Sequence, residues 1–215
     1  MKKKLLATLL AVGAMSAASV GHSAGDASNG ESLVTACAAC HGSDGNSASP
    51  LFPKLAGLGE KYLLKQLQDI KAGTRSVPEM TGLLDNSSEQ DLADMAAYFA
   101  SKTTQLSGAA DSELMLNSGA KVSALALGEQ VYRAGNAETN VPACTGCHSP
   151  SGQGNAPAGY PRLSGQFADY IEKQLKLFRS GERANDGETR IMRSVAEHMS
   201  DAEIKAVSAY ISGLN

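Results

Sequence analysis

The chain has 215 residues, enough for one ordinary domain or for two very small ones. Its 19 Lys and Arg residues and 22 Asp and Glu residues give a formal net charge of −3 without a basic stripe, which argues against a nucleic-acid partner. Aromatic residues make up 5% of the chain and Trp is absent, so two domains of about 90 residues each would need something besides apolar side chains to complete their cores.

The first two dozen residues have the composition of a secretory signal peptide. Three lysines precede an uncharged apolar stretch from Leu5 to Val20, and the small residues Gly21 and Ser23 follow. This order predicts a cleaved leader over 1–23, with cleavage after Ala24 as the neighbouring choice. An uncleaved anchor is the alternative, although Ser, Gly and Thr dilute the apolar stretch. No later segment is long and apolar enough to span a bilayer, so we expect an exported, soluble protein in an oxidising compartment.

All four cysteines lie in one kind of motif. The two motifs read Cys37-Ala-Ala-Cys40-His41 and Cys144-Thr-Gly-Cys147-His148. On a helix, positions i, i+3 and i+4 share one face. Two thiols spaced in this way can add to the two vinyl groups on one edge of a porphyrin, and the adjacent histidine then reaches the iron from the same side. The motif is typical of c-type haem attachment, so we expect two covalently bound haem c groups.

Three other interpretations of the cysteines compete with haem attachment. Four cysteines in an exported protein could form disulfides. They could form a zinc site, but 103 residues separate Cys40 from Cys144, well beyond the spacing of a zinc ribbon. They could be thioredoxin-like redox pairs, which do not require a following histidine. A histidine follows both pairs here, which favours haem attachment over all three.

The chain contains an internal duplication. Two segments of the first half recur 108 residues later: Tyr62–Leu67 as Tyr170–Leu175, and Pro53–Gly57 as Pro161–Gly165. A third recurs 112 residues later: Ser88–Tyr98 as Ser200–Tyr210. The offsets differ through short insertions, as expected of a diverged duplication. We therefore predict two haem domains, over 24–104 and 125–215, joined by a linker over 105–124.

Helical patterns dominate both predicted domains. A short helix is predicted to run into each Cys-x-x-Cys-His motif. A middle helix is predicted over Glu60–Lys71, with its leucines on one side, and recurs over Ala168–Arg179. Each domain then closes with a helix that begins at a capping box, Ser88-x-x-Asp91 or Ser200-x-x-Glu203. No strand pattern persists, so the predicted fold is all-α, with haem completing each core.

Three stretches rich in Gly, Pro or Ser are predicted to lack long helices. Gly42–Pro53 and Ser149–Pro161 follow the two motifs and are expected to form loops around the haem edges. The stretch from Thr103 to about Ala124 has no counterpart in the repeat and is predicted to be the linker. Within it, Glu113–Leu116 could form a helical turn.

The second axial ligand of each iron can be sought with the repeat. The candidates in the mature chain are Met80, Met95, Met115, Met192, Met199 and His198. At the offset of 112, Met80 pairs with Met192, whereas the partners of the others are not ligands: Val207 for Met95, Ser87 for Met199 and Asn86 for His198. Met80 also follows Val77-Pro78-Glu79 in a loop, where amphipathic packing does not account for it.

The other candidates have structural interpretations. Met95 and Met199 are predicted to lie in the cores, Met115 in the linker, and His198 at an exposed helix start. We therefore predict Met80 and Met192 as the partners of the two motif histidines. His/Met ligation raises the reduction potential relative to bis-His ligation. It also fills both axial positions, which leaves no place for a substrate on the iron.

Together these residues resemble the bacterial cytochrome c4 family, periplasmic two-haem carriers made of two class I cytochrome c domains. The resemblance covers nearly all of Ala24–Asn215 and rests on the paired motifs, the Pro-x-Leu-x-Gly and Tyr-x-x-x-Gln-Leu segments, and Gly128–Gly135. It implies that Cys37, Cys40, Cys144 and Cys147 hold haem, and that His41, Met80, His148 and Met192 bind iron. It also implies that the carbonyls of Pro53 and Pro161 accept from the ring N–H groups of the ligand histidines.

The same resemblance implies a function and partners. The family passes electrons from the quinol-oxidising part of respiration to terminal oxidases, often in association with the membrane surface. We therefore expect a periplasmic carrier with a redox-protein donor, a membrane-bound terminal oxidase as acceptor, no small-molecule substrate and no catalytic residues. One departure from the family is the extended linker around Glu113–Lys121, which bears on the geometry between the domains and not on the ligands.

Two other functions compete with that of a carrier. A dihaem peroxidase would keep one sixth position open, whereas here both halves keep a Met in the same register. A docking subunit, such as the two-haem partner of a flavoprotein dehydrogenase, has the same fold, and the sequence leaves it open. Because each half is poor in aromatic residues, we also expect the two domains to pack together.

Overall fold

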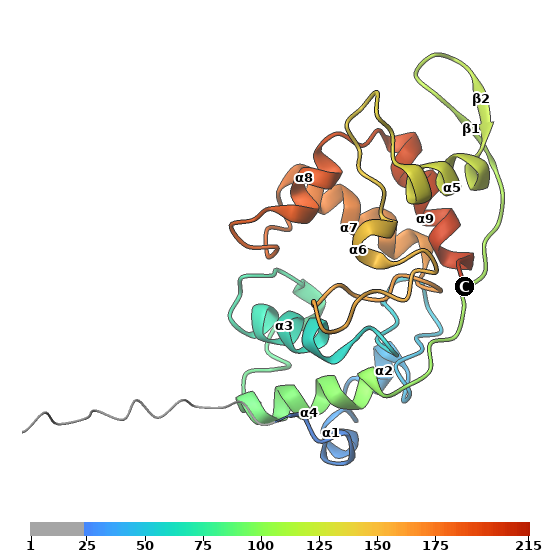
Figure 1. The fold of residues 1–215 in the computed structure, drawn as a ribbon. Helices are drawn as coiled ribbons and strands as arrows, with labels where there is room; N and C mark the ends of the chain where they lie inside the picture. Colours follow the sequence, from blue (N-terminus) through green and yellow to red (C-terminus); the bar gives the residue numbers. More distant parts are fainter. Residues whose placement is uncertain (1–23) are drawn as a thin grey trace, which may run out of the picture.

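The computed structural model describes residues 24–215, and the predicted signal peptide lies outside the described residues. The chain forms two helical halves, here called the first half (24–104) and the second half (125–215), with an extended segment along one side (Figure 1). The first half contains α1 (Ala27–Leu33), α2 (Ala38–His41), α3 (Glu60–Lys71), the 3₁₀ turn η1 (Pro78–Met80) and α4 (Glu89–Ala100). The second half contains α5 (Ala124–Ala134), α6 (Thr145–His148), α7 (Ala168–Ser180), α8 (Ile191–Glu197) and α9 (Asp201–Gly213).

Each half is built on two helices whose backbones touch where they cross. In the first half α1 lies against α4 (Figure 1), and a Cβ at Gly30 would collide with the carbonyl of Asp94. In the second half α5 lies against α9, and a Cβ at Gly128 would collide with the carbonyl of Ala206. Only glycine permits so close an approach. The two halves therefore use the same device to bring their first and last helices together.

The predicted middle and closing helices are confirmed. Helix α3 has the predicted bounds, and α7 is one residue longer than predicted. Both closing helices begin at the predicted capping boxes. The hydroxyl of Ser88 accepts from the N–H of Asp91, whose carboxylate accepts from the N–H of Ser88, and Ser200 and Glu203 repeat this exchange. The first-turn N–H groups that a helix leaves unpaired are thereby partly satisfied.

The helix predicted to run into each motif is interrupted before the cysteines. Helix α1 ends at Leu33, and the first motif forms the separate single turn α2. Helix α5 ends at Ala134, and the next residue, Gly135, has a φ of 71°, which glycine adopts without strain. The chain then turns back, with Asn136 and Val141 pairing through two backbone hydrogen bonds, before it enters α6. The reversal explains why a continuous helix does not form there.

The linker contains a hairpin that was not predicted. Strand β1 (Glu113–Met115) pairs antiparallel with β2 (Lys121–Ser123), and these are the only strands of the described residues. The helical turn considered for Glu113–Leu116 is wrong. Leu114 is buried against Ala124 and Ala206 while its two neighbours are exposed, an alternation that suits a strand and not a helix. The all-α prediction holds for both halves outside this hairpin.

The linker is fixed to both halves along its course. It rises along one side of the molecule from the end of α4 to the hairpin (Figure 1). On the first half, Thr104 Oγ1 donates to the carbonyl oxygen of Ala56 at 2.6 Å. On the second half, Ser107 Oγ donates to the carbonyl oxygen of Gly165 at 2.8 Å. The two halves are therefore not joined by a free tether.

Each half has its own hydrophobic core. The first-half cluster has Leu92, Phe99 and Met95 among its buried members, and the second-half cluster has Val131, Ile204 and Met199. The interpretation of Met95 and Met199 as core residues is thus confirmed, since they are 6% and 4% exposed. Over residues 24–215, no helix combines the length and apolarity needed to cross a bilayer.

Candidate haem sites

The two cysteine–histidine motifs form matching single helical turns. The N–H of His41 donates to the carbonyl of Cys37, and that of His148 to the carbonyl of Cys144, both at 2.9 Å. An i to i+4 bond places the first cysteine and the histidine on one face of the turn. None of the four cysteines forms a disulfide. Each motif thus presents two thiols and one imidazole with the spacing that haem attachment needs.

The first cysteine of each motif lies at the edge of a hydrophobic core. Cys37 packs against the first-half cluster and Cys144 against the second-half cluster. Burial raises the pKa of the Cys37 thiol, and raises that of Cys144 to about 11. Reactive cysteines of redox enzymes have the opposite shift, which stabilises the thiolate. This environment therefore disfavours the thioredoxin-like interpretation.

The two motif histidines are buried and held in one tautomer. Each is 7% exposed. The Nδ1 atom of His41 lies 2.8 Å from the carbonyl oxygen of Pro53, and that of His148 lies 2.9 Å from the carbonyl oxygen of Pro161. Because a carbonyl can only accept, Nδ1 carries the proton and donates. Burial lowers the pKa of both rings, which favours the neutral form. A neutral ring with a free Nε2 atom is the state that binds a metal, so the donor set fits haem iron.

Met80 and Met192 each reach the core cluster that the first cysteine of the same half also contacts. Both side chains are half-buried. They differ in local structure, because Met80 ends η1 whereas Met192 is the second residue of α8. The structure therefore gathers the sulfur of one methionine and the first cysteine of the motif around a shared core in each half.

Two of the remaining ligand candidates lie on the surface. Met115 is 66% exposed on β1 of the linker, as predicted. His198 is exposed, as predicted, but it follows the end of α8, whereas the sequence placed it at a helix start. Neither residue packs against the core cluster of its neighbouring half.

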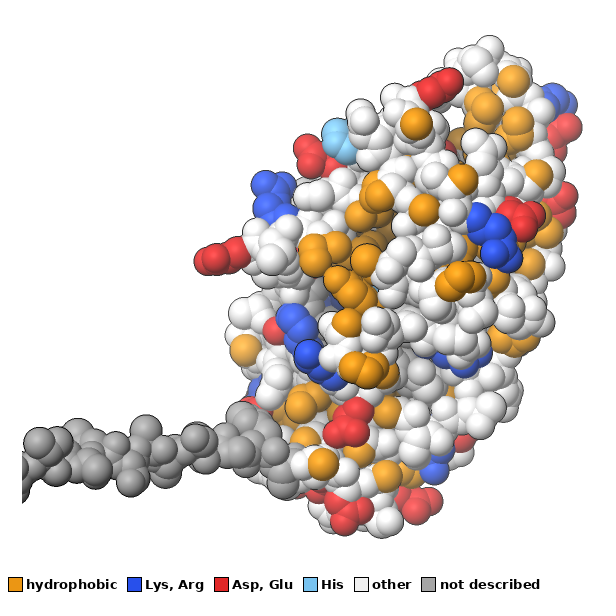
Figure 2. Space-filling model, viewed as in Figure 1, with side chains coloured by type: hydrophobic (Ala, Val, Ile, Leu, Met, Phe, Trp, Pro, Cys, Tyr) orange, Lys and Arg blue, Asp and Glu red, His pale blue; other side chains and the backbone are white. Residues whose placement is uncertain are grey.

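A hollow in the molecular surface adjoins the second motif. Figure 2 shows hydrophobic side chains gathered around this hollow, over the part of the second half where Figure 1 places α6 and α8. In the first half, a cavity of about 330 Å³ lies against Met80, and its lining combines the apolar residues Ile70, Val77 and Leu84 with polar ones such as Lys71, Arg75 and Asp85. Met80 and Met192 also pack against the hydrophobic core clusters of their halves, and this apolar side of each site suits a porphyrin face.

The two halves meet through reciprocal contacts between residues that the repeat relates. Arg75 Nη2 donates to the hydroxyl of Tyr170 at 3.0 Å, and Arg183 Nη2 donates to the hydroxyl of Tyr62 at 3.3 Å. Both arginines also donate to the side-chain oxygens of two glutamines, Gln66 and Gln174. The tyrosines and glutamines belong to the repeated segments Tyr62–Leu67 and Tyr170–Leu175, but no interface was predicted from them. They form the interface between the halves.

A further contact ties the interface to the first histidine. The N–H of Lys54 donates to Gln166 Oε1 at 3.0 Å, and Gln166 Nε2 donates to the carbonyl of Lys54 at 2.9 Å. Lys54 directly follows Pro53, whose carbonyl orients His41. The second half therefore supports the loop that holds the histidine of the first half. No sequence motif marked Gln166, because the repeat has no glutamine at the equivalent position, Leu58.

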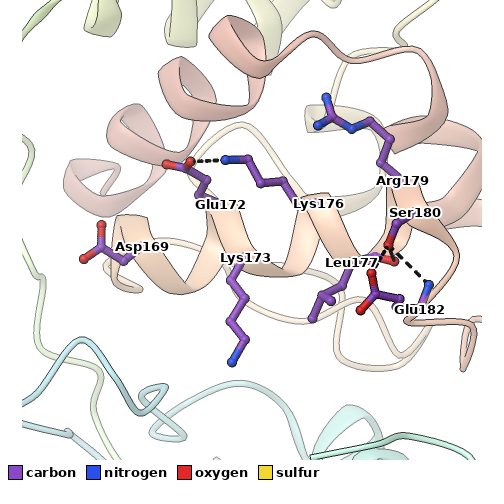
Figure 3. Close-up of a pocket in the computed structure, with 8 residues that line it drawn as sticks. All are labelled: Asp169, Glu172, Lys173, Lys176, Leu177, Arg179, Ser180 and Glu182. Atoms are coloured by element: carbon purple, nitrogen blue, oxygen red, sulfur yellow. Dashed lines mark hydrogen bonds and ion pairs between the residues drawn. The ribbon is translucent and has the colours of Figure 1, made fainter.

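A shallow depression on α7 lies apart from both motifs (Figure 3). It is lined by Asp169, Glu172, Lys173, Lys176, Leu177, Arg179, Ser180 and Glu182. Lys176 pairs with Glu172 at 2.6 Å, and the Ser180 hydroxyl donates to Glu182 at 3.0 Å. Among residues 24–215 no three His, Cys, Asp or Glu side chains gather into a metal site. The depression thus presents charged pairs without a cluster of candidate catalytic groups.

Comparison with known proteins identifies the family. Residues 27–103 and 125–215 match the family Cytochrome c. The chain is 54% identical to cytochrome c4 of Azotobacter vinelandii over 224 residues that cover all of both chains. The chain belongs to the cytochrome c4 family. The crystal structure of reduced recombinant cytochrome c4 from Pseudomonas stutzeri is similar with a TM-score of 0.82 and 51% identity, over 89% of this chain and 100% of that chain.

A more distant relative carries a different description. The thiosulfate dehydrogenase electron acceptor of Stutzerimonas stutzeri is 36% identical, over 83% of this chain and 79% of its own length. Membership of the cytochrome c4 family makes the chain a dihaem electron carrier of two tandem, mostly helical cytochrome c domains. It carries two covalently bound haem c groups, which the motifs at Cys37–His41 and Cys144–His148 fit. Bound haem supplies redox-active iron at each site.

Proposed function

We propose that this cytochrome c4-family protein passes electrons from the quinol-oxidising part of respiration to a membrane-bound terminal oxidase. The observation that carries the proposal is the equivalence of the two sites. Both have a buried histidine with a free Nε2 atom and a methionine at the same core. A carrier needs both axial positions filled in each domain, whereas an enzyme that acts at iron needs one of them open. Two complete donor sets therefore favour a carrier that is not an enzyme.

The ligand set and the domain division are part of this proposal. His41 with Met80, and His148 with Met192, would bind the two irons, and the four cysteines would hold the haems through thioethers. The carbonyls of Pro53 and Pro161 would fix the planes of the two imidazole rings. The haem domains would be 24–104 and 125–215, with 105–124 as the linker. The hydrogen bonds from both histidines support the assignment, because they leave the same ring atom free in each half.

We place the mature protein in the periplasm, at times bound peripherally to the inner membrane. The lysines, apolar stretch and small residues of 1–23 support export through a cleaved signal peptide. Cell fractionation tests the location, and haem-bearing protein in the cytoplasm would contradict it. Mass spectrometry of the mature amino terminus distinguishes cleavage after Ser23 from cleavage after Ala24.

A partner dehydrogenase is the second candidate donor. The 36% identity to a thiosulfate dehydrogenase electron acceptor favours it, whereas the 54% identity to a cytochrome c4 favours the respiratory role. Co-purification discriminates the two candidates. A carrier should be isolated alone at moderate ionic strength, whereas a dehydrogenase subunit should be isolated with a stoichiometric partner that reduces it.

Reconstitution with membranes tests the respiratory role directly. Membranes from a strain that lacks this protein are washed and supplied with quinol, and oxygen uptake is measured before and after the purified holoprotein is added. We expect added protein to increase uptake in proportion to its concentration. A variant with both cysteines of each motif replaced by alanine serves as a haem-free control. If the reduced holoprotein is not oxidised by these membranes in air, the proposed acceptor is wrong.

A further inference from the structure

The two halves differ in the segment that leads to the candidate methionine ligand. Five positions separate Arg75 from Met80, and nine separate Arg183 from Met192. The arginines occupy equivalent places in the interface, so the second half has four extra residues between the interface and its methionine. The longer segment contains Asp186, whose contacts have no counterpart in the first half.

Asp186 holds the first turn of α8 by accepting hydrogen bonds from both the backbone and the side chain of Arg193. Its Oδ1 atom accepts from Arg193 Nε at 2.6 Å, and its Oδ2 atom accepts from the backbone N–H of Arg193 at 3.0 Å. Arg193 Nη2 also donates to the carbonyl oxygen of Gly187 at 2.6 Å. The side chains of Asp186 and Arg193 are 8% and 19% exposed, so solvent screens this ion pair little.

Helix α8 depends on this contact because it has no cap of its own. The residue before it, Arg190, has a φ of 49°, in the left-handed region, and its side chain accepts no hydrogen bond from the helix. Asp186 supplies the missing acceptor to Arg193, the third residue of the helix. Met192 lies immediately before Arg193. The position of its sulfur therefore depends on a turn that the carboxylate of Asp186 fixes.

The first half presents Met80 without such a contact. Asp186 lies in the segment that is four residues longer in the second half, and Thr81 stands in place of Arg193, so the ion pair has no counterpart in the first half. Thr81 is exposed. The turn that carries Met80 begins at Pro78, whose ring restricts φ but anchors the turn to no other element.

The loop that carries Asp186 is itself anchored on the first half. Asn185 Nδ2 donates to Gln66 Oε1 at 2.9 Å and to Asp69 Oδ2 at 2.6 Å, and Lys65 Nζ donates to the carbonyl oxygen of Asn185 at 2.7 Å. Asn185 is 8% exposed. The adjacent residue, Asp186, is thus held in place by the interface between the halves while its carboxylate holds the turn with Met192.

We propose that Asp186 is a positioning residue for Met192, and that the second half therefore releases its axial methionine more slowly than the first half does. Asp186 would touch neither haem nor iron, and would act through the backbone and side chain of Arg193. This inference rests on the proposed ligation of the two irons by Met80 and Met192. It adds a functional difference between two sites whose donor atoms are the same.

Cyanide binding to the ferric holoprotein tests the inference, because cyanide reaches a His/Met iron only after the methionine leaves. Loss of the weak far-red absorption of Met-ligated haem follows the reaction. We expect two phases in the wild-type protein, with the fast phase absent from Met80→Ala. In Asp186→Asn the slow phase should become about tenfold faster, as expected for loss of hydrogen bonds to a charged group, and the fast phase should not change.

Two further variants control for charge and for folding. Glu188→Gln removes the same charge from the same loop at an exposed residue whose side chain forms no hydrogen bond or ion pair, and should keep the wild-type slow phase. Asp186→Glu retains the carboxylate, and should keep the slow phase closer to the wild-type rate than Asp186→Asn does. Loss of half the far-red absorption from resting Asp186→Asn, with both haems still attached, would also support the positioning role.

The inference and the ligand assignment can fail separately. If Asp186→Asn and Glu188→Gln both bind cyanide at the wild-type rates, Asp186 does not position Met192. The same conclusion follows if Asp186→Asn accelerates both phases equally, because the effect is then not confined to the second half. If Met192→Ala keeps the full far-red absorption, Met192 is not a ligand and the proposed ligation itself is wrong.

Discussion

In the first half the loop after the motif is held by Tyr98 of the last helix, α4, whereas in the second half it is held by Tyr132 of the first helix, α5. Their hydroxyls donate to the carbonyl oxygens of Ser43 and Ser149 at 2.8 and 2.7 Å. Tyr210, the repeat partner of Tyr98, accepts from an arginine at the surface instead. Divergence has thus changed which tyrosine donates and which carbonyl accepts, since Ser43 follows His41 by two positions and Ser149 follows His148 by one.

A buried carboxylate on the last helix of each half shows the same pattern. Asp94 of α4 is 2% exposed and accepts from the N–H of Asp26 at the start of α1. Glu203 of α9 is 4% exposed and accepts from the side chain of Asn136, just after α5. The two acids lie at different positions of the repeat, yet both tie the first helix of their half to the last. The same kind of contact between the first and last helices therefore occurs in both halves, although residues at different repeat positions supply it.

The largest effect is expected when the thioether bonds to haem are removed from one half only. Replacement of Cys37 and Cys40 by alanine should lower the mass by one haem and destabilise the first half by several kcal/mol, since the group fills a core that is poor in aromatic residues. The second half should keep its haem. Denaturing mass spectrometry and thermal unfolding measure both effects. A mass that still corresponds to two haems would contradict the assignment of this motif.

The second-largest loss of stability is expected from substitutions at the two helix crossings, α1 with α4 and α5 with α9. Gly128→Ala and Gly30→Ala should each lower the free energy of unfolding by about 3 kcal/mol or more, because the new methyl group would meet a backbone carbonyl that cannot move aside. Denaturant unfolding of the holoprotein measures the change. Gly146→Ala, at a glycine whose counterpart in the first motif is already Ala39, is the matched control and should stay within about 0.5 kcal/mol of wild type.

Substitutions in the interface between the halves should cost less stability, and the two equivalent tyrosines should differ in that cost. Tyr170→Phe and Tyr62→Phe each remove one acceptor from an arginine that crosses between the halves, so each should cost about 1 kcal/mol of stability. Tyr170→Phe should cost more, because its bond to Arg75 is shorter than that of Tyr62 to Arg183 and because Asn185 also accepts from Arg183. Equal costs would show that the interface is symmetric in energy as well as in topology.

The smallest effect concerns acid stability. The N–H of Asp26 and the amide of Asn29 lower the pKa of Asp94, so the unfolded state takes up a proton before the folded state does as the pH falls. The stabilisation by this carboxylate is present above its unfolded pKa and is lost as the pH falls through its folded pKa. Asp94→Asn should therefore flatten the loss of stability below about pH 4. Measurement of the unfolding free energy against pH tests this. The same loss of stability below about pH 4 in Asp94→Asn as in the wild type would contradict the role given to Asp94.

Much of the fold and of the candidate site could be predicted because it depends on local spacing. The motifs, the α3 and α7 patterns and the capping boxes at Ser88 and Ser200 are each contained within a few turns of chain. The register of the repeat then paired Met80 with Met192 without any structure. These features could be read from the sequence because each of them involves residues that are close along the chain.

The features that escaped prediction depend on contacts between distant residues. Gln166 reaches Lys54 across 112 positions, and Asn185 reaches Gln66 across 119, so no local pattern marks either. The hairpin escaped because three-residue strands are too short to show a period of two, and Leu114 alone marks its buried face. The four-residue insertion was visible as a change of offset from 108 to 112, but only the structure brings Asp186 to Arg193.

The proposed carrier has two equivalent His/Met sites, and the far-red absorption of the ferric holoprotein tests them most directly. Met80→Ala and Met192→Ala should each remove about half of this absorption, and the double variant should remove all of it, because each methionine supplies one of two equivalent sulfur ligands. Met199→Ala, at a methionine buried in the second-half core, should leave the absorption unchanged. Full absorption in Met80→Ala or in Met192→Ala, or its loss in Met199→Ala, would contradict the account.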